Sequence, residues 1–310
     1  MKSAPSMICL GGPTAAGKSA AALALAERLG GEIVSVDSIQ VYRGLDVGAA
    51  KPPPEARARV PHHLIDVADL REVFDAARFV KLAKETIADI RSRGRLPILC
   101  GGTGFYFKAL LVGLDKLPPA DPRLRAELAQ APLEALLEEL RKADPETWRA
   151  IDRANPRRVR RAVEILRLTG RPPSELRTKW GQGKAPPPDA PILVLARPRG
   201  ALRRRIEERS QRMFASGLIK ETRELLGLGL AENPTASRAL GYRQAIEFLE
   251  GRRSLEETVR LVQIRTWQFA RRQLAWFKRQ LPAKWVPLSA EASAEEAAQR
   301  LLHELDCSGS

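Results

Sequence analysis

The chain has 310 residues, 44% of them hydrophobic, which is enough for a full hydrophobic core and a second, smaller unit. Its 52 Lys and Arg exceed its 37 Asp and Glu, and the net charge of +15 favours a large anionic partner such as nucleic acid, although an ordinary basic surface would give the same charge. Three widely separated Cys and only three His argue against a disulfide framework and against a Cys/His zinc site.

The N-terminal segment is too short in apolar residues for export or for a membrane anchor. Residues 7–10 are a four-residue apolar run that two glycines follow, and no run in the chain approaches the length of a membrane span. We therefore expect a cytoplasmic protein that does not bind membranes.

A phosphate-binding loop pattern comes directly after that run. Residues 12–19 read GPTAAGKS, and residues 19–29 predict a helix that Gly30 and Gly31 end. In such a loop the backbone N–H groups surround a phosphate, Lys18 adds a positive charge and the Ser19 hydroxyl can bind Mg²⁺. The alternative is a chance Gly-rich turn.

Three more short apolar runs predict further strands, at residues 32–36, 96–100 and 192–195. Their alternation with helical segments is typical of an α/β fold with a parallel sheet and helices on both faces, whose ligands bind at the carboxyl ends of the strands. We therefore expect the phosphate loop, Asp37 and Thr103 to meet at one edge of the sheet.

The composition changes between residues 117 and 190, which are charged, rich in Leu and Ala, and bounded by the Pro-rich stretches 117–122 and 181–191. The sequence predicts that residues 1–116 form the first part of a P-loop-type core and that residues 117–190 form a helical insertion. Residues 191–310 would then add the last core strand and C-terminal helices, with a frayed end from residue 303.

Two polar positions at strand ends are candidates for chemistry. Asp37 could accept a proton or hold Mg²⁺ as a carboxylate that faces the phosphate loop, or it could cap the following turn. The sequence GGTG at 101–104 could bring backbone and the Thr103 hydroxyl close to a ligand, or it could be a plain turn between a strand and a helix.

Arginine-rich segments are candidates for contact with polynucleotide phosphates. A helix from Asn155 and Pro156 would bury Val159, Ala162, Val163 and Leu166, so that Arg157, Arg160 and Arg161 project outward. Few acids oppose them, which favours phosphate contact. In residues 265–280 aromatic side chains could stack on bases, but their helical spacing favours a place in the core.

These features leave two classes of protein open. One is an enzyme that transfers a group from or to a phosphorylated donor, and the other is an ATPase that moves on nucleic acid. The ATPase would need an apolar strand that ends in Asp or Asp-Glu, and "VSVD" followed by Ser is only half of that signature. A small-molecule kinase fits the loop but does not explain the arginines.

Five collinear segments carry a resemblance over nearly the whole chain: "GPTAAGKS" (12–19), "VDSIQVYRGLDVGAAKP" (36–52), "PHHLIDV" (61–67), "GGTGFYFKALLVGL" (101–114) and "ASRALGYRQ" (236–244). They resemble the bacterial tRNA dimethylallyltransferase family, also called the IPP transferase family. The resemblance implies a monomer that uses Mg²⁺ and transfers a prenyl group from dimethylallyl diphosphate to N6 of the adenine just 3′ of a tRNA anticodon. The target base would be flipped into a channel between core and insertion.

The resemblance also implies residue roles. Asp37 matches the general base, Thr103 a residue at the reacting centre and Arg209 an arginine that steadies the leaving diphosphate, although Arg205 could share that role. The diphosphate-binding positions are Gly12, Pro13, Thr14, Ala15, Ala16, Gly17, Lys18 and Ser19, with Ser19 on Mg²⁺. The positions that match contacts to tRNA are Asp37, Ser38, Ile39, Gln40, Thr103, Arg125, Arg157, Arg158, Val159, Arg160 and Arg161.

The sequence departs from the usual family pattern at a few positions. Ser19 keeps a hydroxyl where Thr is frequent, whereas Ala49 removes one. Two rival enzymes remain: an adenylate isopentenyltransferase, which would not need the insertion or the charge, and a P-loop kinase, which would turn over ATP and lack affinity for tRNA.

Overall fold

The computed structural model describes residues 5–115, 117–176, 186–187 and 189–306. The chain divides into two compact units, one made of residues 1–111 and 185–310 and the other of residues 112–184. The predicted insertion, 117–190, begins and ends a few residues later than the second unit. Its Pro-rich boundary at 181–191 lies partly outside the described residues.

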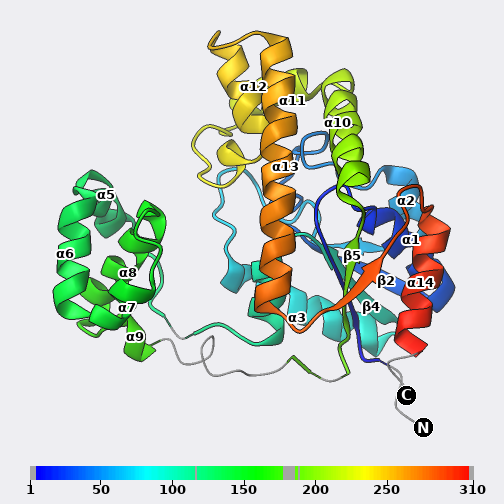
Figure 1. The fold of residues 1–310 in the computed structure, drawn as a ribbon, viewed down its shortest axis with the longest axis horizontal. Helices are drawn as coiled ribbons and strands as arrows, with labels where there is room; N and C mark the ends of the chain where they lie inside the picture. Colours follow the sequence, from blue (N-terminus) through cyan, green and yellow to red (C-terminus); the bar gives the residue numbers. More distant parts are fainter. Residues whose placement is uncertain (1–4, 116, 177–185, 188, 307–310) are drawn as a thin grey trace. The chain divides into compact units, whose positions relative to one another are not determined.

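The larger unit is built on a six-stranded parallel sheet in the order β3-β2-β4-β1-β5-β6 (Figure 1). Its strands are β1 (Ile8–Gly11), β2 (Gly31–Val36), β3 (His62–His63), β4 (Leu96–Gly101), β5 (Ile192–Ala196) and β6 (Lys284–Pro287). The four predicted strands and the parallel α/β fold are confirmed. The edge strands β3 and β6 were not predicted, because β3 has only two residues and β6 has only Trp285 and Val286 between Lys284 and Pro287, which is no clear apolar run.

Helices cover both faces of this sheet. Helix α1 (Lys18–Leu29) and helix α14 (Ala294–Asp306) share one apolar core with β1, β4 and β5. Helices α3 (Ala76–Ser92) and α4 (Gly104–Leu111) pack together, and Phe79 of α3 stacks on Tyr106 of α4 at 4.3 Å. The prediction of a frayed end from residue 303 is wrong for 303–306, which belong to α14, whereas 307–310 lie outside the described residues.

The remaining helices of this unit include a long one that contacts the sheet edge. They are α2 (Pro54–Arg59), α10 (Arg199–Ala215), α11 (Leu218–Leu226), the short 3₁₀ turn Ala236–Arg238, α12 (Tyr242–Leu249) and α13 (Leu255–Gln280). Helix α13 lies beside α10 (Figure 1). Its Phe277 is fully buried against Gly11, where a Cβ would lie 2.6 Å from the ring. The expected core position of the aromatics holds for Phe277, whereas Phe269 is 37% exposed.

The second unit is helical in its described part, as predicted. It contains α5 (Pro122–Gln130), α6 (Leu133–Ala143), α7 (Pro145–Ala150), α8 (Pro156–Thr169) and α9 (Pro173–Leu176). Asn155 caps α8 by accepting a hydrogen bond from the Arg158 N–H at 3.4 Å. The predicted buried residues Val159, Ala162 and Val163 of α8 pack against Leu128, Leu136 and Leu140, which gives this unit a core of its own.

Candidate active site

Loops from four strands meet at the carboxyl edge of the sheet, three of which the sequence predicts to meet there. The phosphate loop follows β1, Asp37 follows β2, Thr103 follows β4 and Arg197 follows β5. The Thr103 N–H donates to the Val36 carbonyl at 3.3 Å, so the turns after β4 and β2 are joined directly. The parallel strand order therefore brings together residues that lie far apart in the sequence.

The phosphate loop has the backbone of an anion-binding site. Gly12 has φ +140°, and a Cβ there would lie 2.8 Å from the Leu195 carbonyl oxygen; Gly17 has φ +96° at the N-cap of α1. Among the described residues, no protein acceptor pairs with the N–H groups of Ala15, Gly17, Lys18 and Ser19. These donors and the N-terminus of α1 are therefore free to bind an anion.

The other predicted loop residues shape the loop instead of offering a backbone donor. Pro13 has no N–H, and its carbonyl accepts hydrogen bonds from the Ala16 N–H at 3.3 Å and from Lys18 Nζ at 2.7 Å. The Thr14 N–H donates to Gln273 Oε1 at 2.9 Å, and the Ala16 side chain is fully buried. Only the hydroxyl of Thr14 remains for a ligand, and Ser19 is exposed in the first turn of α1.

Two cationic side chains and one carboxylate lie beside this loop. Burial lowers the pKa of Lys18 to about 8; Cys100 and Asp37 oppose this shift, while Arg209 adds to it. Burial also lowers the pKa of Arg209, and the Asp37 charge partly offsets it. In the described part of the chain, no hydrogen bond or ion pair is made by the Arg209 guanidinium, so an anionic ligand would supply the acceptors that it lacks.

Asp37 caps the following turn and still leaves one carboxylate oxygen for chemistry. Its Oδ1 accepts hydrogen bonds from the N–H groups of Ile39 at 2.8 Å and Gln40 at 3.3 Å. Within the described residues, neither Asp37 Oδ2 nor the half-buried Thr103 hydroxyl has a protein partner. The two interpretations of Asp37, turn cap and base, are therefore compatible, because each oxygen can serve one of them.

The segment after Asp37 is held by the protein itself. Gln40 accepts a hydrogen bond from Ser35 Oγ at 2.8 Å and donates to the carbonyls of Ala49 and Ala50 at 3.3 Å, so its side chain spans the segment. Glu221 accepts hydrogen bonds from the N–H groups of Asp46, Val47 and Gly48 and, at 2.7 Å, from the Tyr242 hydroxyl. Sequence analysis missed Glu221, because its pattern on α11 is that of an ordinary surface acid.

Two arginines fix the outer side of the phosphate loop. Arg205 Nε donates to the Ala15 carbonyl at 3.0 Å, where Ala15 has the left-handed φ of 63°. Arg197 Nε donates to the Ala16 carbonyl at 2.9 Å, and its other nitrogens donate to the carbonyls of Ser289, Ala290 and Ala292. The structure thus gives Arg205 a bond to the loop backbone, whereas Arg209 is the arginine with an uncommitted guanidinium.

The glycines of GGTG allow close packing of other protein segments, whereas the sequence suggested that they let a ligand approach. A Cβ on Gly101 would clash with the backbone of Val36. A Cβ on Gly102 would meet the Gln273 amide, and one on Gly104 would meet the Trp276 ring. The missing side chains of these glycines therefore leave room for β2 and α13. Thr103, between them, is the residue of this turn whose side chain we expect to face a ligand.

The predicted tRNA-contacting residues of the helical unit fall into two groups: some are buried or bonded to other protein groups, and the others are exposed. Val159, a predicted tRNA-contacting position, is fully buried in the unit's core, so its side chain is not available for such a contact. Buried Glu164 pairs with Arg125 at 2.9 Å and Arg161 at 2.7 Å, and Arg160 donates to the Ala129 carbonyl at 3.0 Å. Arg157 and Arg158 are exposed and form no ion pair with a described residue, so they are the cations of α8 that remain available to phosphates.

Burial by itself would raise the pKa of Glu164. Hydrogen bonds from Arg161, Arg125 and the Asp121 N–H outweigh that effect and hold the pKa below its ordinary value. The sequence predicts few opposing acids within α8, and Glu164, on the buried side of this helix, is one of them. Glu127 and Glu139 of other helices also pair with Arg167 of α8.

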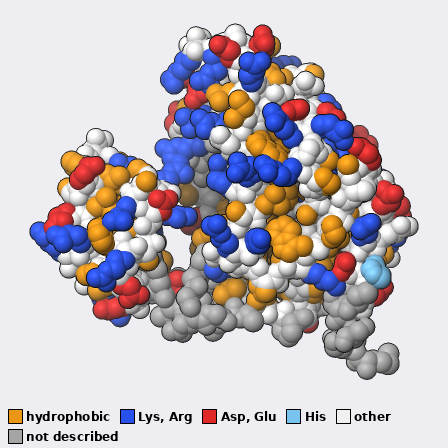
Figure 2. Space-filling view, in the orientation of Figure 1, with side chains coloured by type: hydrophobic (Ala, Val, Ile, Leu, Met, Phe, Trp, Pro, Cys, Tyr) orange, Lys and Arg blue, Asp and Glu red, His pale blue; other side chains and the backbone are white. Residues whose placement is uncertain are grey.

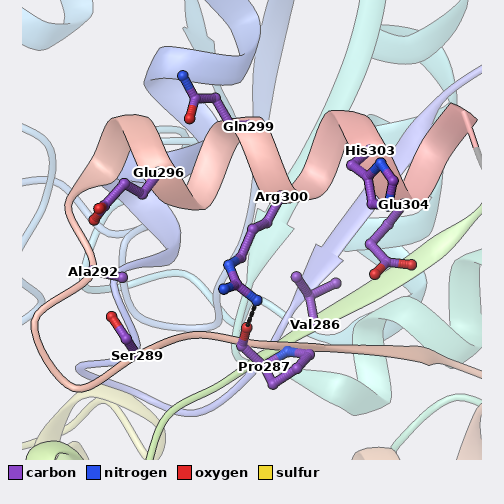
Figure 3. Close-up of a pocket in the computed structure, with 9 residues that line it drawn as sticks. All are labelled: Val286, Pro287, Ser289, Ala292, Glu296, Gln299, Arg300, His303 and Glu304. Atoms are coloured by element: carbon purple, nitrogen blue, oxygen red, sulfur yellow. Dashed lines mark hydrogen bonds between the residues drawn. The ribbon is translucent and has the colours of Figure 1, made fainter.

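Other surfaces of the described residues carry less chemistry. A pocket of about 460 Å³ lies between α14 and the segment after β6 and contains none of the predicted site residues; Arg300 there donates to the Pro287 carbonyl (Figure 3). No group of three His, Cys, Asp or Glu among the described residues could hold a metal. No described helix is long and apolar enough to cross a membrane.

Basic side chains gather on the larger unit. Figure 2 shows Lys and Arg over the part of its surface that α13 and the neighbouring helices form. On α13, Arg260, Arg265, Arg271 and Arg272 are exposed, and Arg272 lies 5.9 Å from the centre of the Phe269 ring. A surface of this kind suits an extended anion such as a polynucleotide.

Comparison with known proteins gives a consistent result. The family model for IPP transferases matches residues 40–280. The chain is 48% identical to the tRNA dimethylallyltransferase of Halorhodospira halophila, over 88% of this chain and 90% of that protein, and 43% identical to that of Deinococcus radiodurans, over 93% and 95%.

Two solved structures are similar along most of the chain. The tRNA isopentenylpyrophosphate transferase of Bacillus halodurans has 35% identity and a TM-score of 0.70, with 98% of this chain and 97% of that one covered. A eukaryotic dimethylallyltransferase acting on tRNA has 26% identity and a TM-score of 0.79, with 96% of this chain and 77% of that one covered.

The lowered pKa of Lys18 predicts a pH dependence of anion binding. In the free protein Lys18 loses its charge as the pH rises above about 8, whereas a bound anion raises the pKa of Lys18. The affinity for the anion is therefore full well below pH 8 and falls above it. We expect the advantage in pyrophosphate affinity of the wild type over Lys18→Ala to shrink by up to about tenfold from pH 8 to pH 9, measured by isothermal titration calorimetry. An advantage that stays constant to pH 10 would contradict the lowered pKa.

Proposed function

The chain belongs to the IPP transferase family, and from this premise we propose how its candidate active site carries out the reaction of a tRNA dimethylallyltransferase. The enzyme transfers the dimethylallyl group from dimethylallyl diphosphate to N6 of the adenine just 3′ of the tRNA anticodon, which gives N6-isopentenyladenosine. The observation that supports this mechanism best is the placement of Lys18 and Arg209 beside free loop N–H groups, with the Asp37 carboxylate close to both.

The phosphate loop binds the diphosphate of the donor. The free N–H groups of Ala15, Gly17, Lys18 and Ser19 point an array of donors at it, and the Lys18 ammonium adds a charge. As the bond between C1 of the dimethylallyl group and the diphosphate oxygen breaks, negative charge builds on that oxygen. Lys18 and Arg209 therefore stabilise the transition state more than the bound substrate.

Mg²⁺ suits this site as the partner of the diphosphate. The exposed Ser19 hydroxyl is the loop group that would hold it. When bound, the ion neutralises charge on the departing diphosphate.

Asp37 takes the proton of the acceptor amine. The adenine N6 attacks C1 of the dimethylallyl group, the C1–O bond breaks, and one N6 proton passes to Asp37 Oδ2 as the new C–N bond forms. The hydrogen bonds to Oδ1 fix the carboxylate while Oδ2 stays open. The Thr103 hydroxyl, on the turn bonded to Val36, is placed to orient the base or the amine.

The acceptor reaches this edge only when it leaves the anticodon-loop stack, so we propose that the target adenine is flipped out. Ser38 and Ile39, on the turn that Asp37 caps, contact the flipped base, whereas the Gln40 side chain supports that turn. Arg157 and Arg158 of α8 contact the tRNA backbone. We further propose that the enzyme works as a monomer in the cytoplasm, where its tRNA substrate resides.

The function is tested by incubating the purified protein with Mg²⁺, dimethylallyl diphosphate and an unmodified tRNA that has adenine 3′ of the anticodon. Mass spectrometry of the digested nucleosides should show a five-carbon addition on that adenine. AMP and ATP serve as parallel substrates. Prenylated AMP, or ATP turnover without tRNA modification, would identify one of the rival enzymes instead.

Asp37→Asn keeps the turn cap and removes the base. We expect the single-turnover rate of prenylation to fall by about 10²- to 10⁴-fold, because general base catalysis contributes factors of this size. Pyrophosphate affinity should change little. Asp69→Asn removes an exposed carboxylate that pairs with Arg43 and is the control. An unchanged rate in Asp37→Asn would show that another group takes the proton.

Arg158→Glu reverses an exposed charge of α8. We expect weaker tRNA binding and a slope of log Kd against log salt concentration that is smaller by about 1 to 2, because released counterions set this slope. Fluorescence anisotropy of labelled tRNA at several salt concentrations measures both. Arg141→Glu changes the same charge on α6, where Arg141 already pairs with Glu138, and should have a smaller effect. Equal effects of the two variants would rule out a phosphate contact at residue 158.

A further inference from the structure

Gln273 of α13 lies between the two loops that carry the two halves of the active site. Its Oε1 accepts a hydrogen bond from the Thr14 N–H of the phosphate loop at 2.9 Å. Its Nε2 donates to the Gly102 carbonyl, one residue before Thr103, at 2.9 Å. One amide therefore connects a loop whose free N–H groups suit the diphosphate with the turn that presents Thr103.

Both ends of this amide are needed, and they are not interchangeable. The phosphate-loop end offers a donor and the Gly102 end offers an acceptor, so only a side chain with an acceptor and a donor at this spacing satisfies both. Gln273 is 7% exposed, where hydrogen bonds are stronger than in water and an unsatisfied group is costly. The position of the amide is also fixed, because Phe277 packs on Gly11 and Trp276 packs on Gly104.

We infer that Gln273 is a positioning residue for the prenyl transfer, which sets the phosphate loop and the Thr103 turn at a fixed separation. The inference rests on the proposed function. The donor is bound by one loop and the acceptor amine lies against the other turn, so the distance between C1 and N6 follows the distance between the two loops. Misplacement by about 1 Å is enough to slow such a reaction by about 10²-fold.

The role differs from that of the loop arginines. Arg197 and Arg205 donate hydrogen bonds to carbonyls of the phosphate loop from its outer side, and the described residues include no hydrogen bond from either arginine to the Thr103 turn. Their loss would loosen one loop, whereas the loss of Gln273 would leave each loop in place and uncouple the two. Gln273 should therefore affect the rate of transfer more than the binding of the diphosphate.

The test is a double-mutant cycle of Gln273 with Thr103. In Gln273→Met, which keeps length and packing but loses both hydrogen bonds, we expect kcat with saturating tRNA and donor to fall by about 10- to 100-fold. The Kd of pyrophosphate should change by less than about threefold. In a Thr103→Ala background, where the positioned hydroxyl is already absent, the same change should lower kcat by only about threefold or less.

Three controls separate positioning from a loss of structure. Rates are taken per active site from the burst amplitude, so unfolded protein lowers the amplitude and leaves the rate per site unchanged. Gln268→Met, on the same helix with its amide against Arg265, should keep the wild-type kcat. Gln273→Glu keeps an acceptor for Thr14 but has no donor for Gly102, so its kcat should also fall.

Two results would overturn the inference. The first is an equal fall in kcat for Gln273→Met in the wild-type and Thr103→Ala backgrounds, which would mean that Gln273 acts independently of the Thr103 turn. The second is wild-type kcat in Gln273→Glu. A wild-type protein that prenylates no tRNA would instead overturn the proposed function, and the positioning role with it, so the two failures are distinguishable.

Discussion

The arrangement of the site depends on holding two cations in a partly buried position. Burial lowers the pKa of Lys18 more than any neighbouring charge does; Arg209 adds to this effect, and Cys100 and Asp37 oppose it only in part. A fold that held these groups loosely would let them move apart into water. The parallel sheet prevents this, because Lys18 begins a helix packed on the sheet and Arg209 lies on a helix packed along α13. The groups that stabilise a bound diphosphate are therefore in position before the ligand binds.

The loops that surround these charges are held from outside themselves. Backbone carbonyls and N–H groups of the phosphate loop are taken by Arg197, Arg205 and Gln273, which lie more than 180 residues away in the sequence. The segment after Asp37 is held in the same way by Glu221 and Tyr242. Among the described residues, the groups that remain without a protein partner include the N–H groups of Ala15, Gly17, Lys18 and Ser19, one oxygen of Asp37, the Thr103 hydroxyl and the Arg209 guanidinium. Rigid support of this kind leaves a few free groups in fixed positions, as preorganised catalysis requires.

The sequence allowed the strands, the phosphate loop and the meeting of Asp37 with Thr103 to be predicted, because hydrophobic period and parallel topology are local or general rules. It did not allow Gln273 or Glu221 to be found, since an amide or an acid on a helix has no pattern that shows its distant partners. The sequence singled out GGTG for the approach of a ligand, and it could not show that β2 and α13 also require these glycines. Likewise Val159 matched a family position for RNA contact, although its own helical period already placed it in the core.

The support of the phosphate loop by late segments of the chain has a consequence for synthesis on the ribosome. Ala16 leaves the ribosome early, but the carbonyls of Ser289 and Ala292 that share Arg197 with it are among the last to be made. Strand β1 pairs with β5, and β5 pairs with the edge strand β6, so this side of the sheet is complete only when the end of the chain has been made. Contacts of such long sequence separation form slowly. In a nascent chain the phosphate loop therefore lacks this support until translation is nearly complete. We expect that it cannot bind its anionic ligand productively before then.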